Sequence, residues 1–151
     1  MKIIDAQYED LEEILALQRE AFAREAEEFN NWTIDPMVQP LEALQGQFKT
    51  HVFLKAVDEN GTIVGSTRGY RAGGTSYIGR TFVKPSHQGQ GIGTALIHAL
   101  EARNPAERYE INSSIQCPQN IRLYEHLGFV RFKEIREERN GFVYLEKFEL
   151  R

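Results

Sequence analysis

Three glycines alternate with other residues in a short segment between an apolar run and a helix-like run. They are Gly89, Gly91 and Gly93. Glycine lacks a Cβ, so its backbone adopts unusual dihedral angles and approaches a ligand closely. The first amides of a helix have no partner inside the helix, and the helix dipole is positive there. A glycine-rich segment at such a place favours phosphate, so it predicts an anion-binding loop.

Two common phosphate-binding loops fit this segment poorly. A Walker loop requires a lysine directly after its last glycine, and no lysine lies between Gly89 and Arg103. A dinucleotide loop requires G-x-G-x-x-G, whereas the third glycine here comes one residue early. Glu110 stands at a suitable distance for a ribose contact. However, a dinucleotide fold alternates parallel strands with helices, while the strands before this loop are expected to be antiparallel. A nucleotide-binding protein therefore stays only as an alternative.

A tyrosine near the end of a later predicted helix is the second group that could do chemistry. The segment 123–129 reads L-Y-x-x-x-G-F, with Tyr124 as its tyrosine. The loop segment 88–93 reads Q-x-x-G-x-G and is preceded by Val83-x-Pro85. The two segments together resemble the GCN5-related N-acetyltransferase (GNAT) family. The resemblance is firm from about Ser76 to Phe129, and the order of predicted elements extends it along the whole chain.

The resemblance implies a fold of the α/β (α+β) class and a reaction. The fold would be a mixed, mostly antiparallel sheet of about seven strands, flanked by about four helices, with a splayed cleft for acetyl-CoA. The reaction would be transfer of an acetyl group to a primary amine by direct attack in a ternary complex. A non-catalytic acyl-CoA-binding or sensing module is the alternative. The acceptor stays open among polyamines, aminoglycosides, amino acids and protein amines.

The resemblance also implies site residues. The loop would hold the pyrophosphate through backbone amides, the strand before it would pair with the pantetheine arm, and Tyr124 would lie beside the thioester sulfur as a hydrogen-bond donor or general acid. The implied cofactor-binding residues are Phe82, Val83, Gln88, Gly89, Gln90, Gly91, Ile92, Gly93, Thr94 and Asn120. The family often has asparagine where this chain has Cys117. Asn120 lies one helical turn before Tyr124, so it is expected to take over that amide contact.

No single residue stands out as the general base. A primary amine has a pKa of about 10.4, so freeing its lone pair at neutral pH costs about 4.6 kcal/mol and a base would help. The acidic candidates are Glu25, Glu27 and Glu28 at the end of the first predicted helix, and Asp35 in the loop after it. Each of them is also explained as a solvated surface charge.

Other residues bear on the acceptor side and on metal binding. Phe29 and Trp32 are expected either to wall the acceptor pocket or to pack in the core, and Arg68 and Tyr70 are candidates to face the acceptor. The histidines, His87 and His126 among them, show no metal spacing, and Cys117 has no matching histidine for nucleophilic catalysis. No metal is expected.

The element order that must position these residues is β-α-α-β-β-β-α-β-α-β-β in one domain over residues 1–151. The helices are expected from about Ala6, capped by Asp5, to Glu28, and over 41–49, 94–103 and 118–126. Strands are expected over 2–5, 51–57, 62–70, 75–83, 108–115, 129–138 and 142–150, and residues 30–40 are expected to form a loop. Turns are expected at 59–61, 72–74 and 140–141, and Gly128 supplies a left-handed stop after the last helix.

Composition excludes several functional classes. The chain has 151 residues, one cysteine and a net charge of −4. No apolar stretch approaches the roughly 18 residues of a membrane span, and the N-terminus lacks a signal's apolar stretch, so a cytoplasmic protein is expected. The acidity argues against nucleic acid as a partner.

The charge is unevenly distributed along the chain. Residues 1–30 carry three basic and nine acidic side chains. A solvated helix face is the simpler explanation, and a cationic acceptor is the functional alternative that this front would suit. A homodimer is common in the resembled family, and the apolar strands of the terminal hairpin would support one.

Overall fold

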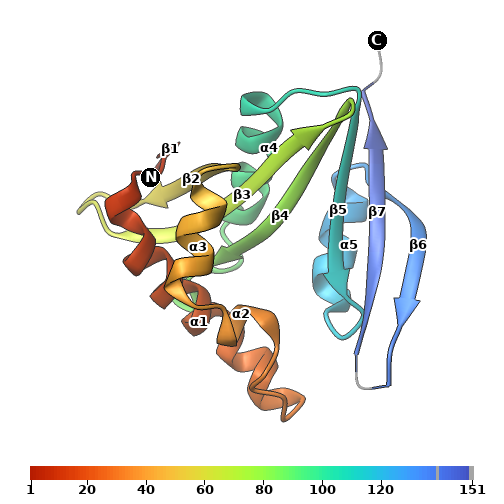
Figure 1. Ribbon diagram of the computed structural model, residues 1–151, viewed down its shortest axis with the longest axis horizontal. Coiled ribbons are helices and arrows are strands. Elements are labelled where there is room, and N and C mark those ends of the chain that lie inside the picture. Colours follow the sequence, from red (N-terminus) through yellow and green to blue (C-terminus); the bar gives the residue numbers. More distant parts are fainter. Residues whose placement is uncertain (139, 150–151) are drawn as a thin grey trace.

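A seven-stranded sheet frames the computed structural model, which describes residues 1–138 and 140–149 (Figure 1). The strand order is β1-β2-β3-β4-β5-β7-β6. All neighbouring strands are antiparallel except β4 and β5, which are parallel. The strands are β1 (Lys2–Asp5), β2 (Val52–Val57), β3 (Ile63–Ala72), β4 (Thr75–Val83), β5 (Arg108–Ser114), β6 (Val130–Arg136) and β7 (Gly141–Phe148). The expected antiparallel meander is therefore β2-β3-β4, and the expected terminal hairpin is β6-β7. The last predicted strand was expected to reach residue 150, which lies outside the described residues.

Helices cover the two faces of the sheet. The helices α1 (Leu11–Glu28), α2 (Asp35–Val38) and α3 (Leu41–Phe48) lie on one face, as Figure 1 shows. The helices α4 (Ile92–Arg103) and α5 (Pro118–His126) lie on the other, with α5 behind β5 and β7. The expected mixed sheet of the α/β (α+β) class is confirmed. It carries five helices rather than about four in the described part of the chain.

Two local expectations are wrong. The first helix does not begin near Ala6 under an Asp5 cap, because a short 3-10 turn, η1 (Tyr8–Asp10), precedes α1 and begins after Gln7. Asp5 instead ends β1, and its carboxylate pairs with Arg103. The segment 30–40 is not all loop, because it contains α2. Pro36 lies in the first turn of α2, where its fixed φ suits a helix and its missing N–H costs nothing.

The parallel pair β4–β5 separates after a short stretch. Thr75–Tyr77 of β4 pair with Arg108–Glu110 of β5, and no further pair follows. Beyond this point β4 stays with β3, whereas β5 stays with β7 along its whole length. The two halves of the sheet therefore open like a V, which Figure 1 shows between β4 and β5. The expected splayed cleft is confirmed at the level of the fold.

The outer hairpin strand β6 is exposed along its whole length. Val130, Phe132 and Ile135 are large apolar residues on it that remain at least partly open to solvent. The apolar character expected of the terminal hairpin is thus present on an uncovered strand, and the homodimer itself stays a prediction.

Close packing between α4 and the sheet depends on glycine in β3. A Cβ at Gly69 would collide with the backbone oxygen of Tyr77 and press on Leu100 of α4. Gly65, four residues earlier on β3, is less crowded: a Cβ there would lie 3.1 Å from Leu96 of α4 and 3.1 Å from the Phe82 carbonyl. Since the obstacle at Gly69 is backbone, a small side-chain movement does not relieve it.

We therefore expect Gly69→Ala to lower the free energy of unfolding by about 2 kcal/mol or more, which urea titration measures. Gly46→Ala is the matched control, because Gly46 lies exposed in α3 with open space around its Cβ position. That control should raise stability by up to about 1 kcal/mol, as alanine is the better helix former. Equal stability of Gly69→Ala and the unsubstituted protein would show that the α4 contact is not tight.

Candidate active site

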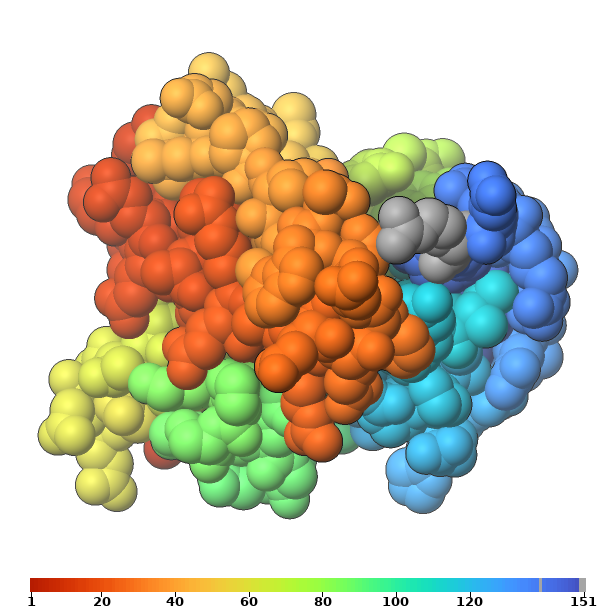
Figure 2. All heavy atoms as spheres, turned by 90° about the horizontal axis from the view of Figure 1, so that it is seen from below, coloured from red at the N-terminus to blue at the C-terminus, as the bar shows by residue number. Residues whose placement is uncertain are grey.

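A cleft of about 940 Å³ opens where the two halves of the sheet separate. Four segments line it: the C-terminal half of α1, the end of β4, the glycine loop before α4, and α5. In Figure 2, the end of α1 and the segment after it (orange) lie between the glycine loop (green) and α5 (cyan). Every residue implied for cofactor binding or catalysis lines this cleft except Gln90, which is exposed.

The glycine loop forms an open cradle at the start of α4. Gly89 and Gly91 have φ values of +79° and +82°, which disfavour any residue with a side chain. A Cβ at either glycine would meet open space, so the backbone rather than a packed neighbour requires glycine there. The first helical amide with an intrahelical partner belongs to Ala95, which donates to the Gly91 carbonyl at 3.0 Å. The earlier amides of this turn suit an anion in the cleft.

The Gln88 side chain ties this loop to the sheet. Its Nε2 donates to the backbone carbonyl of Val83 at 3.1 Å. Val83 is the last residue of β4, so the bond fixes the loop relative to the strand edge that borders the cleft. The Gln88 side chain therefore fixes the loop to β4 through its amide group.

Tyr124 lies at the floor of the cleft with only a small exposed fraction, 6%. Burial, together with the nearby Cys117, raises the pKa of Tyr124 to about 12. At neutral pH its hydroxyl is therefore protonated and available as a donor. Asn120, one turn earlier on α5, lines the same cleft.

A contact between α1 and α5 was missed by the sequence reasoning. The Cys117 thiol donates a hydrogen bond to Glu25 Oε1 with a sulfur–oxygen distance of 2.5 Å. Burial, Glu25 and Glu28 all raise the pKa of this thiol, so Cys117 stays protonated. The two residues are 92 positions apart, and no local pattern signals their proximity.

The acceptor-side candidates separate into two groups. Glu25, Glu28 and Phe29 line the cleft, as does His87 from the loop. Glu27 and His126 are exposed and do not line it, and Trp32 is half-exposed. These positions narrow the acidic candidates on α1 to two.

The remaining candidates, Asp35, Tyr70 and Arg68, do not line the cleft. Asp35 of α2 forms an ion pair with Arg80 of β4, with 2.8 Å between Asp35 Oδ2 and Arg80 Nη2. Tyr70 stacks on Tyr77 with ring centroids 5.0 Å apart. Arg68, which was expected to face the acceptor, is instead buried and does not line the cleft.

Arg68 is held by neutral acceptors. It donates to the Oε1 atoms of Gln18 and Gln39, each at 3.0 Å, and lies over the ring of Phe53. Burial and the neighbouring Arg80 lower its pKa to about 9. Arg68 therefore joins α1, the segment before α3, and the sheet, which is a structural role.

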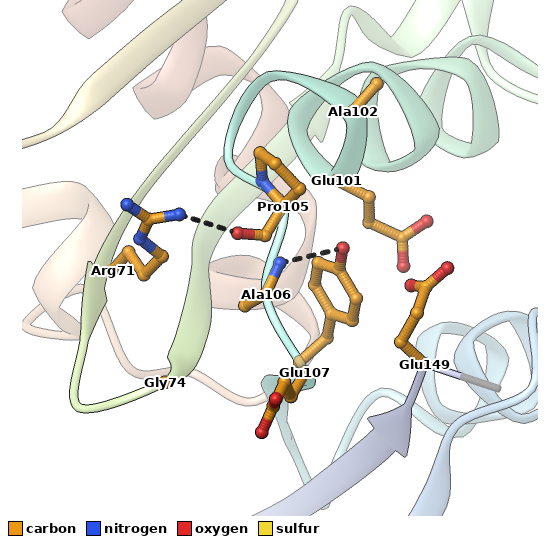
Figure 3. Close-up of a pocket in the computed structure, with 9 residues that line it drawn as sticks. Arg71, Gly74, Glu101, Ala102, Pro105, Ala106, Glu107 and Glu149 are labelled. Carbon is orange, nitrogen blue, oxygen red and sulfur yellow. Dashed lines mark hydrogen bonds between the residues drawn. The ribbon is translucent and has the colours of Figure 1, made fainter. Parts of the chain in front are cut away.

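A second hollow, of about 970 Å³, lies at the opposite end of α4 (Figure 3). Its lining includes Glu101, Glu107 and Glu149, together with Tyr109. Arg71 is also there and donates to the Pro105 carbonyl at 2.9 Å. Glu101 pairs with Lys147, and Glu107 and Glu149 add two further carboxylates beside the single arginine of this lining. The hollow therefore suits a diphosphate worse than the glycine-loop cleft does.

A family model described as an acetyltransferase (GNAT) domain matches residues 17–146, which is most of the chain. The chain belongs to the GNAT acetyltransferase family. It is therefore an acyltransferase by family, and the seven-stranded sheet with its open V is the GNAT fold.

Solved structures share this fold over nearly the whole chain. The ribosomal-protein-S18-alanine N-acetyltransferase from Escherichia coli has a TM-score of 0.79 at 18% identity, covering 97% of this chain and 92% of that one. The PaiA N-acetyltransferase from Thermoplasma acidophilum, in complex with coenzyme A, has 0.75 at 18%, covering 99% and 100%. A mutant of the spermidine N-acetyltransferase SpeG from Vibrio cholerae has 0.73 at 16%, covering 98% and 95%. A search of curated proteins finds no match to this GNAT chain.

Within residues 1–138 and 140–149, no group of three or more histidine, cysteine, aspartate or glutamate side chains is placed to hold a metal ion. In the same part of this GNAT chain, none of the helices combines the length and apolar character needed to cross a bilayer.

The protonated state of Cys117 gives a direct test of the cleft floor. We expect a thiol reagent at about pH 8 to label the native protein at least tenfold more slowly than the protein in concentrated urea, because the thiolate is the reactive form. Cys117 is the chain's one cysteine, so the signal needs no correction for other thiols. Equal labelling rates would contradict both the burial and the carboxylate contact.

Proposed function

We propose that this GNAT protein transfers the acetyl group of acetyl-CoA to a primary amine by direct attack in a ternary complex. The observation that carries the proposal is a single cleft that joins an anion-binding loop at one end to a buried, protonated tyrosine at the other. A small molecule or a peptide would supply the amine. The coenzyme-A complex of the PaiA N-acetyltransferase, which shares the fold, supports acetyl-CoA as cosubstrate.

The residues of the cleft fit this cosubstrate at both of its ends. Open backbone at Gly89 and Gly91, followed by the unpaired amides of the first turn of α4, suits a pyrophosphate, and Thr94 adds a hydroxyl nearby. The edge of β4 at Phe82 and Val83, which β5 does not pair, suits the amides of an extended arm. Acetyl-CoA supplies an activated acetyl thioester, whose leaving group is a thiolate.

Tyr124 acts first as a hydrogen-bond donor to that leaving group. A thiol has a pKa of about 8.5, so complete proton transfer from a tyrosine of pKa about 12 is uphill by about 5 kcal/mol if the thiolate is in water. The burial that raises the pKa of Tyr124 acts on a thiolate beside it in the same direction. The donor and the leaving group are thereby brought closer in proton affinity, so the bond becomes strong at the point where sulfur charge develops.

Asn120 is proposed to contact an amide of the cosubstrate. It lines the cleft one turn before Tyr124, so both side chains lie on the side of α5 that faces the cleft. Its effect is expected on cosubstrate affinity rather than on proton transfer.

The deciding experiment measures thiol release from acetyl-CoA with a panel of amines and with the Tyr124→Phe variant. We expect acetyl transfer to at least one amine, and a fall in kcat of about 10–100-fold for Tyr124→Phe with acetyl-CoA affinity changed less than twofold. Tyr8→Phe is the control, because Tyr8 is half-exposed on η1 and lies outside the cleft. Coenzyme A binding without acetylation of any amine would favour a non-catalytic acyl-CoA-binding module instead.

The loop assignment has its own test in Gly91→Ala. At a φ of +82° an alanine strains the backbone by about 1–2 kcal/mol, and the strain is relieved by moving the amides that bind the phosphates. We expect coenzyme A affinity, measured by calorimetry, to fall about tenfold. Gly73→Ala is the matched control, because Gly73 also has positive φ and open space but lies in the β3–β4 turn. Loss of affinity in both variants would point to a general loss of stability.

A further inference from the structure

Glu25 is the acidic residue of α1 that reaches across the cleft to α5. Its side chain is half-buried, and its Oε1 accepts the bond from the Cys117 thiol at 2.5 Å. Cys117 stands directly before α5, the helix that carries Tyr124, and its charge state influences Tyr124. The Glu25 carboxylate is thus held in the cleft close to the donor that the proposed reaction uses.

The charge of Glu25 is not neutralised by a basic residue. Among residues 1–138 and 140–149, no ion pair includes Glu25, and its Oε2 accepts no hydrogen bond there. The neighbouring Glu28, by contrast, pairs with Arg24 one helical turn away, and both of these side chains are largely exposed. Glu25, which lines the cleft, therefore keeps one carboxylate oxygen without a bond in the described part of the chain. The charge of Glu28 is instead compensated by Arg24 in a solvent-exposed ion pair.

We propose that Glu25 binds the ammonium group of the acceptor amine and takes its proton, and that Cys117 is the positioning residue that holds this carboxylate. The inference rests on the proposed function and names the group that the acceptor meets. An alkylammonium has a pKa of about 10.4 and a carboxylic acid about 4.3, so before reaction the two form an ion pair. The thiol occupies Oε1 and leaves Oε2 for the ammonium.

Protons and electron pairs balance in the proposed step. The ammonium loses one proton to Glu25, which releases it to solvent, and the nitrogen lone pair then forms a bond to the acetyl carbon. The carbon–sulfur bond breaks with its electron pair going to sulfur, which takes a proton from Tyr124. The second nitrogen proton restores Tyr124. In sum, an ammonium and a thioester give an amide, a thiol and one proton.

The test compares Glu25→Gln with Glu27→Gln in thiol-release kinetics, with butylamine and 1,4-diaminobutane as cationic acceptors. We expect Glu25→Gln to raise the amine KM and lower kcat by about tenfold each while the acetyl-CoA KM changes less than twofold. Glu27→Gln should remain near the unsubstituted protein, because Glu27 is exposed on the same helix and does not line the cleft. With methoxyamine, an acceptor that is neutral at pH 7, the Glu25→Gln substitution should lower the rate of acetylation far less. An equal loss with methoxyamine, or unchanged kinetics with butylamine, would overturn the role of Glu25.

The positioning role of Cys117 has a separate readout. Cys117→Ser keeps a donor and should keep the amine KM within about threefold, whereas Cys117→Ala should raise it clearly without a change in acetyl-CoA KM. If Cys117→Ala matches the unsubstituted protein, the thiol does not position Glu25.

Binding without turnover separates this inference from the proposed function. If no amine is acetylated, the proposed function fails. Calorimetry of butylamine binding to the coenzyme-A-loaded protein then still tests Glu25: binding that Glu25→Gln abolishes supports the ammonium site, and no binding to the unsubstituted protein overturns it.

Discussion

The separation of β4 from β5 is the constraint on which the rest of the structure depends. Parallel strands pair only while their directions agree, and here the agreement lasts from Thr75 to Tyr77. After that point β3 holds β4, through a register shift between Thr67 and Gly69, and β7 holds β5. The backbone groups at the inner edge of β4 are left without a strand partner, and such groups require a ligand or water. The same opening places α5 across from α1, so the cleft, its loop and its tyrosine are all consequences of one short pairing.

Charge is arranged along the cleft in a way that net charge does not reveal. The proposed anion-binding end consists of backbone amides and glycines, with a glutamine that bonds to the strand, so it suits phosphate without lysine or arginine at its centre. The carboxylates of α1 lie at the other side. Of the acidic side chains in the first 30 residues, Glu25 is the one that we propose binds the acceptor. The buried positive charge of Arg68, whose pKa falls to about 9, lies outside the cleft and binds only glutamine oxygens directly.

Local patterns predicted the elements well because each pattern acts over a few residues. The strands β2 and β3 with the turn between them, and the positive φ of Gly61, Gly89 and Gly128, needed no knowledge of distant contacts. Residues 30–40 were harder, because two prolines and several turn-forming side chains also permit the single turn of α2. The cleft itself came from the family resemblance, since no spacing along one strand shows where its neighbour leaves it.

Side-chain partners across the fold were beyond local reasoning. Glu25 and Cys117 meet only because α1 and α5 approach each other from opposite halves of the sheet. Arg68 was a candidate to face the acceptor, but Gln18 and Gln39, from α1 and the segment before α3, bind it in the interior instead.

Burial then determines which way protons move in the cleft. Tyr124 and Cys117 are both buried on α5 or directly before it, and both keep their protons because an anion there lacks solvation. The floor thus offers the Tyr124 hydroxyl as a neutral donor, while Glu25, whose Oε1 accepts the Cys117 thiol, brings a carboxylate from α1. A negative charge that develops on a leaving sulfur is better placed beside a donor than beside a carboxylate. A positive acceptor is better placed beside the carboxylate. The α5 wall with Tyr124 therefore suits the negative charge that develops on sulfur, and the α1 wall with Glu25 suits the positive charge of the ammonium. The proposed reaction needs both walls.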